Sequence, residues 1–321
     1  MKRLECLDAL RGIAALLVVL QHVLEQAVPH FVLLQWCNIG RLGVFLFFLI
    51  SGFVVPFSIR GDRPLRRFAI SRAARLLPAL WLSIAVMLAF ASATPGVVLA
   101  NMAMIARPLG LPELAGVYWT LTYELAFYLV VAGLFTCGLL RNARVVGLAT
   151  LVLLAGVVPA VPTGYAGMLL NFSLLLTGLL LRLALLEQDP RARPWAVAAT
   201  VALLAAGSGY ALLFDGGNPR IDGLPRLTAT LLAVPIFLAT VLRQPAAGRV
   251  PVFLGTISYS VYLFQEPVLR ALHGLLAIDA TLYVLAVPAA TIAVASAVYF
   301  WVERPFIALG QRRTATRPLP A

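Results

Sequence analysis

Charged residues are scarce in this sequence. Asp, Glu, Lys and Arg together make up 12% of the 321 residues, whereas hydrophobic residues make up 61%. So few charges cannot cover the surface of a soluble domain of this length, which keeps nearly all of its charged side chains in water. The composition therefore excludes an ordinary soluble protein and predicts an all-α, polytopic membrane bundle.

Cysteine is also rare. The chain has three cysteines. We expect Cys37 to face the outside and Cys6 and Cys137 to lie toward the inside, so no disulfide framework follows. No group of Cys, His and carboxylate residues has the spacing of a metal site. We therefore expect chemistry that uses no metal.

Acidic residues are outnumbered by basic ones, 13 against 25, and the net charge is +12. In a soluble protein this excess would suggest nucleic-acid binding, but here it follows from membrane topology. The chain has ten apolar runs long enough to cross a hydrocarbon core of about 30 Å. They cover residues 7–27, 39–58, 75–93, 116–138, 144–161, 165–183, 195–213, 225–242, 252–276 and 281–303.

The basic residues are distributed unequally between the loops that join these ten predicted helices. With the N-terminus in the cytoplasm, most of them fall on the cytoplasmic side, and two (Arg11 and Arg270) lie in the interior of helices. The outer side, including the outer ends of the helices, holds only Arg41, Arg107, Arg220 and Arg226. This distribution satisfies the positive-inside rule. It predicts cytoplasmic N- and C-termini and no nucleic-acid partner.

The loops are short, so we expect one transmembrane domain over residues 1–307 and a basic, disordered cytoplasmic tail over 308–321. The N-terminus superficially resembles a signal peptide, but ionisable residues interrupt its apolar run and no cleavage site follows, so we expect the first helix to be retained. Residues 94–115 combine prolines and glycines with a short apolar run. That composition favours a re-entrant or lid segment on the outer side.

Arg11 and His22 lie inside the first apolar run. Residues eleven positions apart in a helix return to nearly the same face, about 16 Å further along the axis. Because ionisable groups in hydrocarbon are costly and generally functional, the pair predicts a polar reaction path through the bilayer. The alternative is that Arg11 extends to the cytoplasmic headgroups, or pairs with Asp8.

Glu124 is a further intramembrane charge, in the predicted helix 116–138. On the predicted topology it lies at nearly the same depth below the outer surface as His22. A carboxylate beside an imidazole fixes its tautomer and raises its basicity, which suits a general base or a nucleophile. The alternative is a structural pair that only joins two helices.

The cytoplasmic segment before the third run is rich in arginine. Arg72 and Arg75 are three residues apart and point the same way on a helix, with Arg66 and Arg67 nearby. Together they predict an anion-binding site. The alternative is ordinary topogenic charge in contact with lipid headgroups.

Two other segments contain unusual residues for a membrane helix. Ser51 follows an aromatic run between Gly43 and Gly52, where close helix packing is the first explanation. The run 252–276 is polar around Ser258–Pro267, including Glu266. We expect it to form the hydrogen-bonded wall of a polar cavity.

Taken in order, these segments resemble the acyltransferase 3 family of integral-membrane acyltransferases. The matching motifs span essentially the whole chain. They are Leu7-Asp8-x-Leu10-Arg11-Gly12 with His22, Gly43-Val44-Phe45-Leu46-Phe47-Phe48-x-x-Ser51-Gly52-Phe53, Arg72-x-x-Arg75-x-x-Pro78, Trp119-Thr120-Leu121-x-x-Glu124-x-x-Phe127-Tyr128, Ser258-Tyr259-Ser260-x-Tyr262-Leu263 and Glu303-Arg304-Pro305-Phe306.

The resemblance implies transfer of an acyl group, usually acetyl, from cytoplasmic acyl-CoA to a hydroxyl of a surface glycan, a lipid-linked sugar or a small glycoside at the outer face. The roles it implies are catalysis by His22, Glu124 and Arg11, binding of CoA by Arg72, Arg75, Arg66 and Arg67, and substrate contact by Ser51, Trp119, Tyr123, Tyr259, Gln265 and Glu266. Where this chain has Gln265-Glu266-Pro267, the family often has His before x-Pro, and Glu266 is the candidate substitute.

Two other functions stay open. One is a proton-coupled transporter in which Arg11, His22 and Glu124 form a relay. It predicts broken helices in repeated halves, and no clear repeat is present in the sequence. The other is a non-catalytic partner of a glycan assembly complex, which predicts that His22→Ala leaves the phenotype intact.

Overall fold

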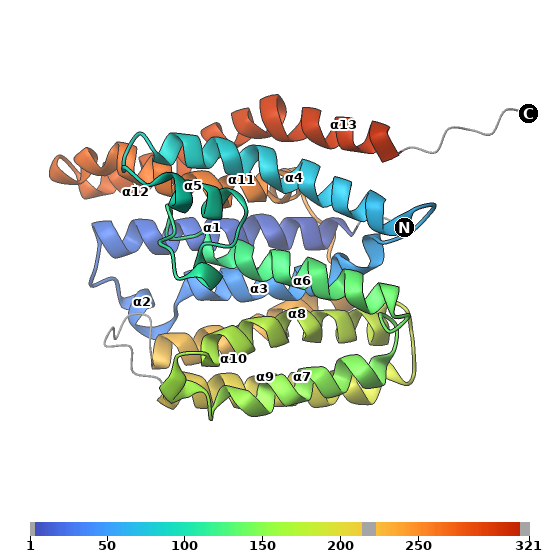
Figure 1. The fold of residues 1–321 in the computed structure, drawn as a ribbon. Helices are drawn as coiled ribbons and strands as arrows, with labels where there is room; N and C mark the ends of the chain where they lie inside the picture. Colours follow the sequence, from blue (N-terminus) through green and yellow to red (C-terminus); the bar gives the residue numbers. More distant parts are fainter. Residues whose placement is uncertain (1–3, 214–222, 315–321) are drawn as a thin grey trace, which may run out of the picture. The chain divides into compact units, whose positions relative to one another are not determined.

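The computed structural model describes residues 4–213 and 223–314, and all regular secondary structure in these residues is helical (Figure 1). Eight of the described helices are long and apolar enough to cross a membrane. They are Glu5–Ala27, Ile39–Ser58, Pro64–Met87, Trp119–Thr136, Ala166–Leu185, Ala192–Leu213, Leu224–Arg243 and Ala280–Arg313. The predicted all-α polytopic class is confirmed.

Each of the ten predicted runs coincides with a helix, and two of these helices fall outside the group of eight. The helix α7 (Ala143–Val157) is apolar but short. The helix α11 (Arg249–Leu272) is long enough but carries the polar residues between Ser258 and Glu266. The sequence therefore located both helices. Its short length separates α7, and its polar residues separate α11, from the eight helices that are long and apolar enough to cross a membrane.

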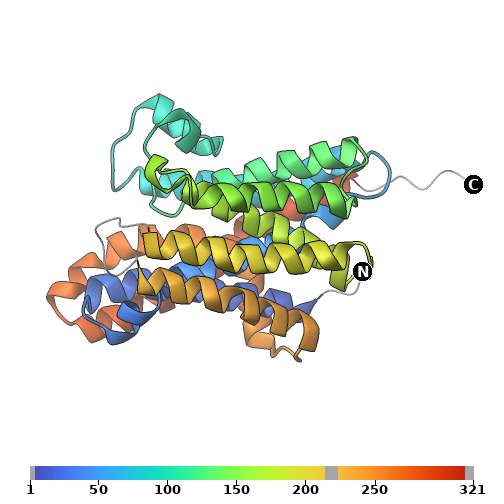
Figure 2. The same ribbon diagram turned by 90° about the horizontal axis from the view of Figure 1, so that it is seen from below.

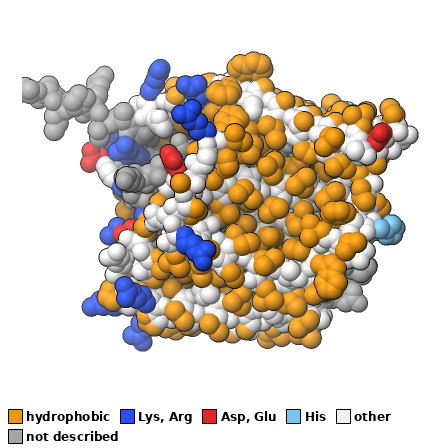
Figure 3. Space-filling model, turned by 180° about the vertical axis from the view of Figure 1, so that it is seen from behind, with side chains coloured by type: hydrophobic (Ala, Val, Ile, Leu, Met, Phe, Trp, Pro, Cys, Tyr) orange, Lys and Arg blue, Asp and Glu red, His pale blue; other side chains and the backbone are white. Residues whose placement is uncertain are grey.

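The exposed surface is rich in apolar side chains. Val152 on α7 is 70% exposed and Val197 is 64% exposed. Figure 3 shows a face covered mainly by hydrophobic side chains, with most of its Lys and Arg side chains gathered toward one edge. Apolar surface on this scale is not left in water, and it agrees with helices that contact lipid.

The chain forms two compact units, and each combines two separate stretches of sequence. The first comprises residues 1–56 and 126–256, and the second comprises residues 57–125 and 257–321. The unit boundaries fall within α6 (Trp119–Thr136) and α11, so each of these helices contributes to both units.

The first unit is a helical bundle whose centre is α3. Besides parts of α6 and α11, it contains α1 (Glu5–Ala27), α2 (Val32–Trp36), α3 (Ile39–Val54), α7, α8 (Ala166–Leu185), α9 (Ala192–Leu213) and α10 (Leu224–Arg243). The helix α3 packs against α1, α8 and α10, while α7, α8 and α9 pack against one another (Figures 1 and 2).

Two glycines permit the close packing of α3. A Cβ at Gly43 would meet the backbone oxygen of Ala14 on α1 at 2.5 Å. A Cβ at Gly52 would meet the backbone oxygen of Leu175 on α8, where Gly178 lies opposite. Both glycines are therefore sites where helix backbones touch, as small residues do in membrane bundles.

The second unit contains α4 (Pro64–Met87), α5 (Pro95–Met102), α12 (Ala280–Val298), a π-helix at Tyr299–Glu303 and α13 (Arg304–Thr314). The helix α4 contacts α5, α13 and the π-helix. It begins at a proline, a residue whose missing N–H costs nothing at the first helical position. The basic segment and the apolar run after it thus belong to one helix.

The C-terminal segment corrects one expectation. Residues 308–314 belong to α13 instead of a disordered tail. Gly310 packs on α4, because a Cβ there would meet Ala74 Cβ at 2.8 Å. This contact orders the segment, while residues 315–321 lie outside the described part of the chain.

Candidate functional site

Arg11 and His22 both lie on α1 and are half-buried. On one side of the helix, Ala14 and Val18 meet α3, and on another side Gly12 meets the N-terminal part of α11. At 100° per residue, Arg11 and His22 lie between these two directions. Both residues therefore lie on one strip of α1 that is flanked by two helix contacts.

A buried glutamine fixes α1 beside His22. Gln21 is 3% exposed, and its Oε1 accepts a hydrogen bond of 3.2 Å from the backbone N–H of Gly40 at the start of α3. Its Nε2 donates to Glu25 Oε1 at 2.7 Å. The position of the next residue on α1, His22, is thus set by a bond to α3 that the sequence did not indicate.

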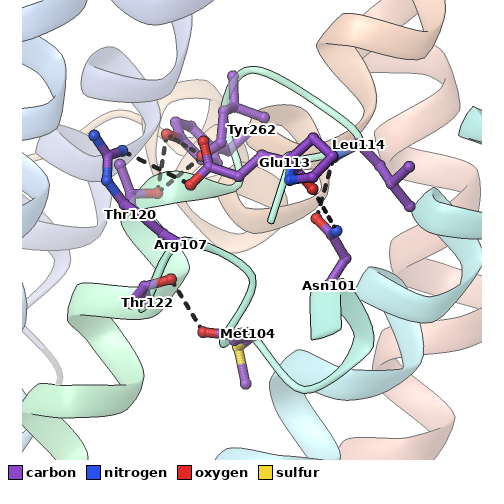
Figure 4. A network of polar contacts seen from close by, with 10 residues as sticks. Asn101, Met104, Arg107, Glu113, Leu114, Thr120, Thr122 and Tyr262 are labelled. Atoms are coloured by element: carbon purple, nitrogen blue, oxygen red, sulfur yellow. Dashed lines mark hydrogen bonds and ion pairs between the residues drawn. The ribbon is translucent and has the colours of Figure 1, made fainter. Parts of the chain in front are cut away.

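Glu124 lies near a hydrogen-bonded junction between α6 and α11. One turn before it, Thr120 Oγ1 donates to the Tyr262 hydroxyl at 3.0 Å, and that hydroxyl donates to the Val117 carbonyl oxygen at 3.0 Å (Figure 4). Glu124 and Glu113 both lie close enough to Tyr262 to interact electrostatically with its hydroxyl. Two carboxylates therefore approach one buried tyrosine.

The loop between α5 and α6 carries an ion pair next to the predicted aromatic residues. Arg107 Nη1 lies 3.7 Å from Glu113 Oε1, and the Arg107 guanidinium lies over the Trp119 ring at 5.7 Å. Trp119 and Tyr123 make an edge-to-face contact with ring centroids 5.7 Å apart. Burial raises the pKa of Glu113 above its ordinary value, and the charge of Arg107 opposes this shift.

Side-chain hydrogen bonds tie this loop to three helices (Figure 4). Asn101 on α5 donates to the Pro112 carbonyl at 3.0 Å and accepts from the Leu114 N–H at 3.1 Å. Thr122 on α6 donates to the Met104 carbonyl at 3.0 Å. On α11, Glu266 accepts from the Gly116 N–H at 2.9 Å. The segment expected as a re-entrant or lid element is α5 followed by this anchored loop.

The four predicted CoA-binding arginines all lie in the first half of α4. Arg72 places its guanidinium 5.7 Å from the centroid of the Phe68 ring. Next to Arg75, the Leu76 carbonyl accepts a hydrogen bond of 2.9 Å from the Tyr259 hydroxyl on α11. Tyr259 therefore joins the arginine-rich part of α4 to α11.

A buried carboxylate lies near the same part of α4. Glu303, at the end of the π-helix, is 1% exposed and accepts a hydrogen bond from the Ser260 hydroxyl. Arg75 is close enough to interact with it electrostatically. Glu303, which belongs to the last of the matching motifs, is thus buried inside the second unit.

The remaining predicted substrate residues differ in their surroundings. Ser51 is half-buried on α3. Gln265 is fully buried, and its amide donates to the Tyr262 carbonyl at 2.9 Å. Glu266 pairs with Arg270 at 2.9 Å in addition to its bond to Gly116. Gln265 thus hydrogen-bonds within its own helix, while Glu266 anchors the loop between α5 and α6.

The structure divides the predicted residues between the two units. Arg11, His22 and Ser51 belong to the first unit, and the other predicted residues belong to the second: Arg66, Arg67, Arg72, Arg75, Trp119, Tyr123, Glu124, Tyr259, Gln265 and Glu266. Within the second unit, Trp119, Tyr123 and Glu124 share one helix beside the anchored loop, and Tyr259 reaches the arginine segment.

Sequence reasoning missed several polar residues of these sites. Arg107 was counted only as an external charge, and Glu113 and Tyr262 received no role, although their charge or polarity next to apolar runs was a signal. Arg182, near the end of the predicted run 165–183, also received no role, but it is 2% exposed, stacks on Phe53 and pairs with Glu187 at 3.2 Å. Within residues 4–213 and 223–314, no group of His, Cys, Asp or Glu side chains is arranged to hold a metal.

The fold and these residues define a polytopic membrane protein whose helices carry several ionisable side chains. A model of the family described as "Acyltransferase domain" matches residues 4–302, so the chain belongs to this family of membrane acyltransferases. This match confirms the resemblance seen in the motifs.

The chain is similar to the "Exopolysaccharide production protein ExoZ" of Rhizobium meliloti (strain 1021). The two are 31% identical over an alignment 322 residues long. The alignment covers 93% of this chain and 97% of the relative. No solved structure matches the chain significantly.

Proposed function

We propose that the protein transfers an acyl group, most simply acetyl, from cytoplasmic acyl-CoA to a hydroxyl of a glycan or glycosylated acceptor at the outer face of a bacterial inner membrane. The observation that carries this proposal is the half-buried strip of α1 that holds Arg11 and His22 in a member of an acyltransferase family. A donor and an acceptor on opposite sides need polar groups within the bilayer to meet. The relative's role in exopolysaccharide production supports a glycan acceptor.

The donor is expected to bind first through its phosphates. Arg72 and Arg75, with Arg66 and Arg67, present four guanidinium groups along the first turns of α4. Guanidinium groups bind phosphate oxygens by paired, charge-assisted hydrogen bonds. In this proposal the pantetheine arm then extends into the bilayer, where Arg11 polarises the thioester carbonyl.

The transfer itself needs one proton to be moved. His22 takes the proton of the acceptor hydroxyl as the oxygen attacks the thioester carbonyl, the C–S bond breaks, and the proton passes to the leaving thiolate. A route through a transiently acylated His22 has the same products. The family resemblance supports a role for Glu124 in stabilising the charge of the imidazole. It also makes Ser51, Trp119, Tyr123, Tyr259, Gln265 and Glu266 the candidates for binding the acceptor.

The experiment compares purified wild-type protein and His22→Ala in nanodiscs with radiolabelled acetyl-CoA and no acceptor. We expect slow hydrolysis or self-labelling by the wild type and its loss in the variant. His30→Ala and His273→Ala are matched controls, because both histidines are exposed, and they are expected to behave as wild type. If the wild type does not bind acetyl-CoA, the proposal fails in its acetyl form.

A further inference from the structure

Arg107 and Glu113 face each other but do not form a hydrogen bond with each other. Their closest atoms are 3.7 Å apart, which is too far for an N–H···O hydrogen bond. Glu113 Oε1 is buried and accepts no hydrogen bond in the described part of the chain. A buried acceptor in this state needs an explanation, because an unsatisfied polar atom costs free energy.

The polar groups around this pair are already engaged. Asn101 and Thr122 bond to loop backbone atoms, and Thr120 and Tyr262 bond to each other and to the Val117 carbonyl (Figure 4). The loop is thus held in place without Arg107 and Glu113. What the pair offers to a ligand is one set of strong donors next to one strong acceptor.

The pair is also accessible and lies beside an aromatic ring. The side chain of Arg107 is 53% exposed and that of Glu113 is 21% exposed. The Trp119 ring lies below the Arg107 guanidinium and contacts Tyr123 at its edge. A few placed polar groups around aromatic surface are the usual composition of a small-ligand site.

We propose that Arg107, Glu113 and Trp119 form an acceptor subsite that binds a neutral sugar ring through two neighbouring hydroxyl groups. One hydroxyl donates to the Glu113 carboxylate, and the other accepts from Arg107, while the ring carbons rest on Trp119. The two opposite charges favour a neutral ring over an acidic one, because a sugar carboxylate would be repelled by Glu113 as much as it is attracted by Arg107.

This inference rests on the proposed function, because a sugar acceptor is what the transfer reaction would consume. The competing explanation is that Arg107 and Glu113 are only an ion pair that closes the loop. An ion pair with one exposed partner and a separation of 3.7 Å contributes little to stability. The two explanations make different predictions for a variant that restores the charges in exchanged positions.

The experiment measures sugar binding to the full-length protein in nanodiscs by saturation-transfer NMR, with cellobiose as the neutral probe and cellobiouronic acid as the acidic one. We expect the wild type to bind cellobiose more tightly than cellobiouronic acid. Arg107→Ala and Glu113→Ala should each weaken the affinity for cellobiose about tenfold, which corresponds to the loss of one charge-assisted hydrogen bond. Arg141→Ala is the matched control, since Arg141 and Glu187 form an exposed pair at 3.6 Å, and should bind as wild type.

A double variant, Arg107→Glu with Glu113→Arg, separates the subsite from a simple ion pair. We expect it to stay impaired in cellobiose binding, because the guanidinium and the carboxylate then exchange their positions relative to the Trp119 ring. Wild-type binding by this variant, unchanged binding by both alanine variants, or no cellobiose binding by the wild type would each overturn the inference. Acetyl-CoA hydrolysis by the same preparations tests the proposed function separately, since it needs no acceptor.

Discussion

At the scale of single residues, hydroxyl side chains fall into two groups. Some bond within their own helix: Thr136, Thr150, Ser173, Thr230, Thr240, Thr256 and Ser296 each donate to a carbonyl four residues earlier. Others join elements that are distant in sequence, as Thr120 does to Tyr262 and Ser260 does to Glu303. The second kind gathers in the second unit, beside Glu124 and Arg75.

The same unit contains Ser83, whose Oγ lies 2.7 Å from the Tyr118 hydroxyl and 3.2 Å from the Leu263 carbonyl oxygen. A tyrosine hydroxyl is protonated at physiological pH even with its ordinary pKa, and burial raises the pKa of Tyr118 further, to about 12. Tyr118 is thus a permanent neutral partner for Ser83, and it holds the start of α6 in place.

Glycine 52 permits a first prediction at this scale. Gly52→Ala should lower the thermal stability of the purified protein, because its Cβ would overlap the Leu175 backbone oxygen on α8, and overpacking a helix contact costs about 1–3 kcal/mol. Gly133→Ala is the matched control, since nothing lies within 4 Å of a Cβ there. It should be neutral or stabilising. Equal melting temperatures of the two variants would contradict this account.

At the scale of helices, α7 shows that an apolar helix is not always long enough to cross a membrane. Its 15 residues span about 22 Å at 1.5 Å per residue, which is shorter than the hydrocarbon core of about 30 Å. Gly147 lets Trp195 on α9 approach the α7 backbone, since a Cβ at Gly147 would overlap the indole ring. Packing on α8 and α9 therefore accommodates a helix that is too short to cross the bilayer unaided.

The start of α12 permits a second prediction. Asp279 accepts hydrogen bonds from the N–H groups of Thr281 at 2.6 Å and Leu282 at 3.1 Å, and these bonds lower its pKa. A carboxylate whose pKa is lowered by folding stabilises the folded state above its ordinary pKa, and this stabilisation is lost as the pH falls through the lowered value.

Hydrogen exchange measures this effect at the Thr281 and Leu282 amides after correction for the intrinsic pH dependence. Wild type should lose protection at acidic pH, and Asp279→Ala should lack this protection at all pH values. Asp279→Asn is the control, because an amide oxygen caps the helix without titrating and its protection should not depend on pH. Loss of protection by the Asn variant in the same pH range would exclude the capping carboxylate as the cause.

At the scale of the whole molecule, the positive-inside distribution makes a third prediction. Alkaline phosphatase fused after Leu111 should be active, because that loop is expected outside, and the same enzyme fused after Asp62 should be inactive. A green fluorescent protein fused to the C-terminus should fluoresce, because it folds only in the cytoplasm. The opposite pattern would invert the topology, and with it the sides assigned to donor and acceptor.

Much of the candidate site was predictable one helix at a time. Arg11 and His22 were placed on one face of a helix by their spacing, and α1 carries them on such a strip. Arg72 and Arg75 were likewise placed on one helix, and α4 contains both. These predictions needed only the helical repeat, which is a local property.

The sequence by itself determined the class of protein, the positions of its membrane helices and the family, because apolar length, charge distribution and ordered motifs are read along the chain. Only the tertiary structure decided that Arg107 faces Glu113, that Glu303 accepts from Ser260 and that Arg182 is buried against Phe53. Partners such as Ser260 and Glu303 lie 43 residues apart, and which helix faces meet depends on packing that no local pattern records.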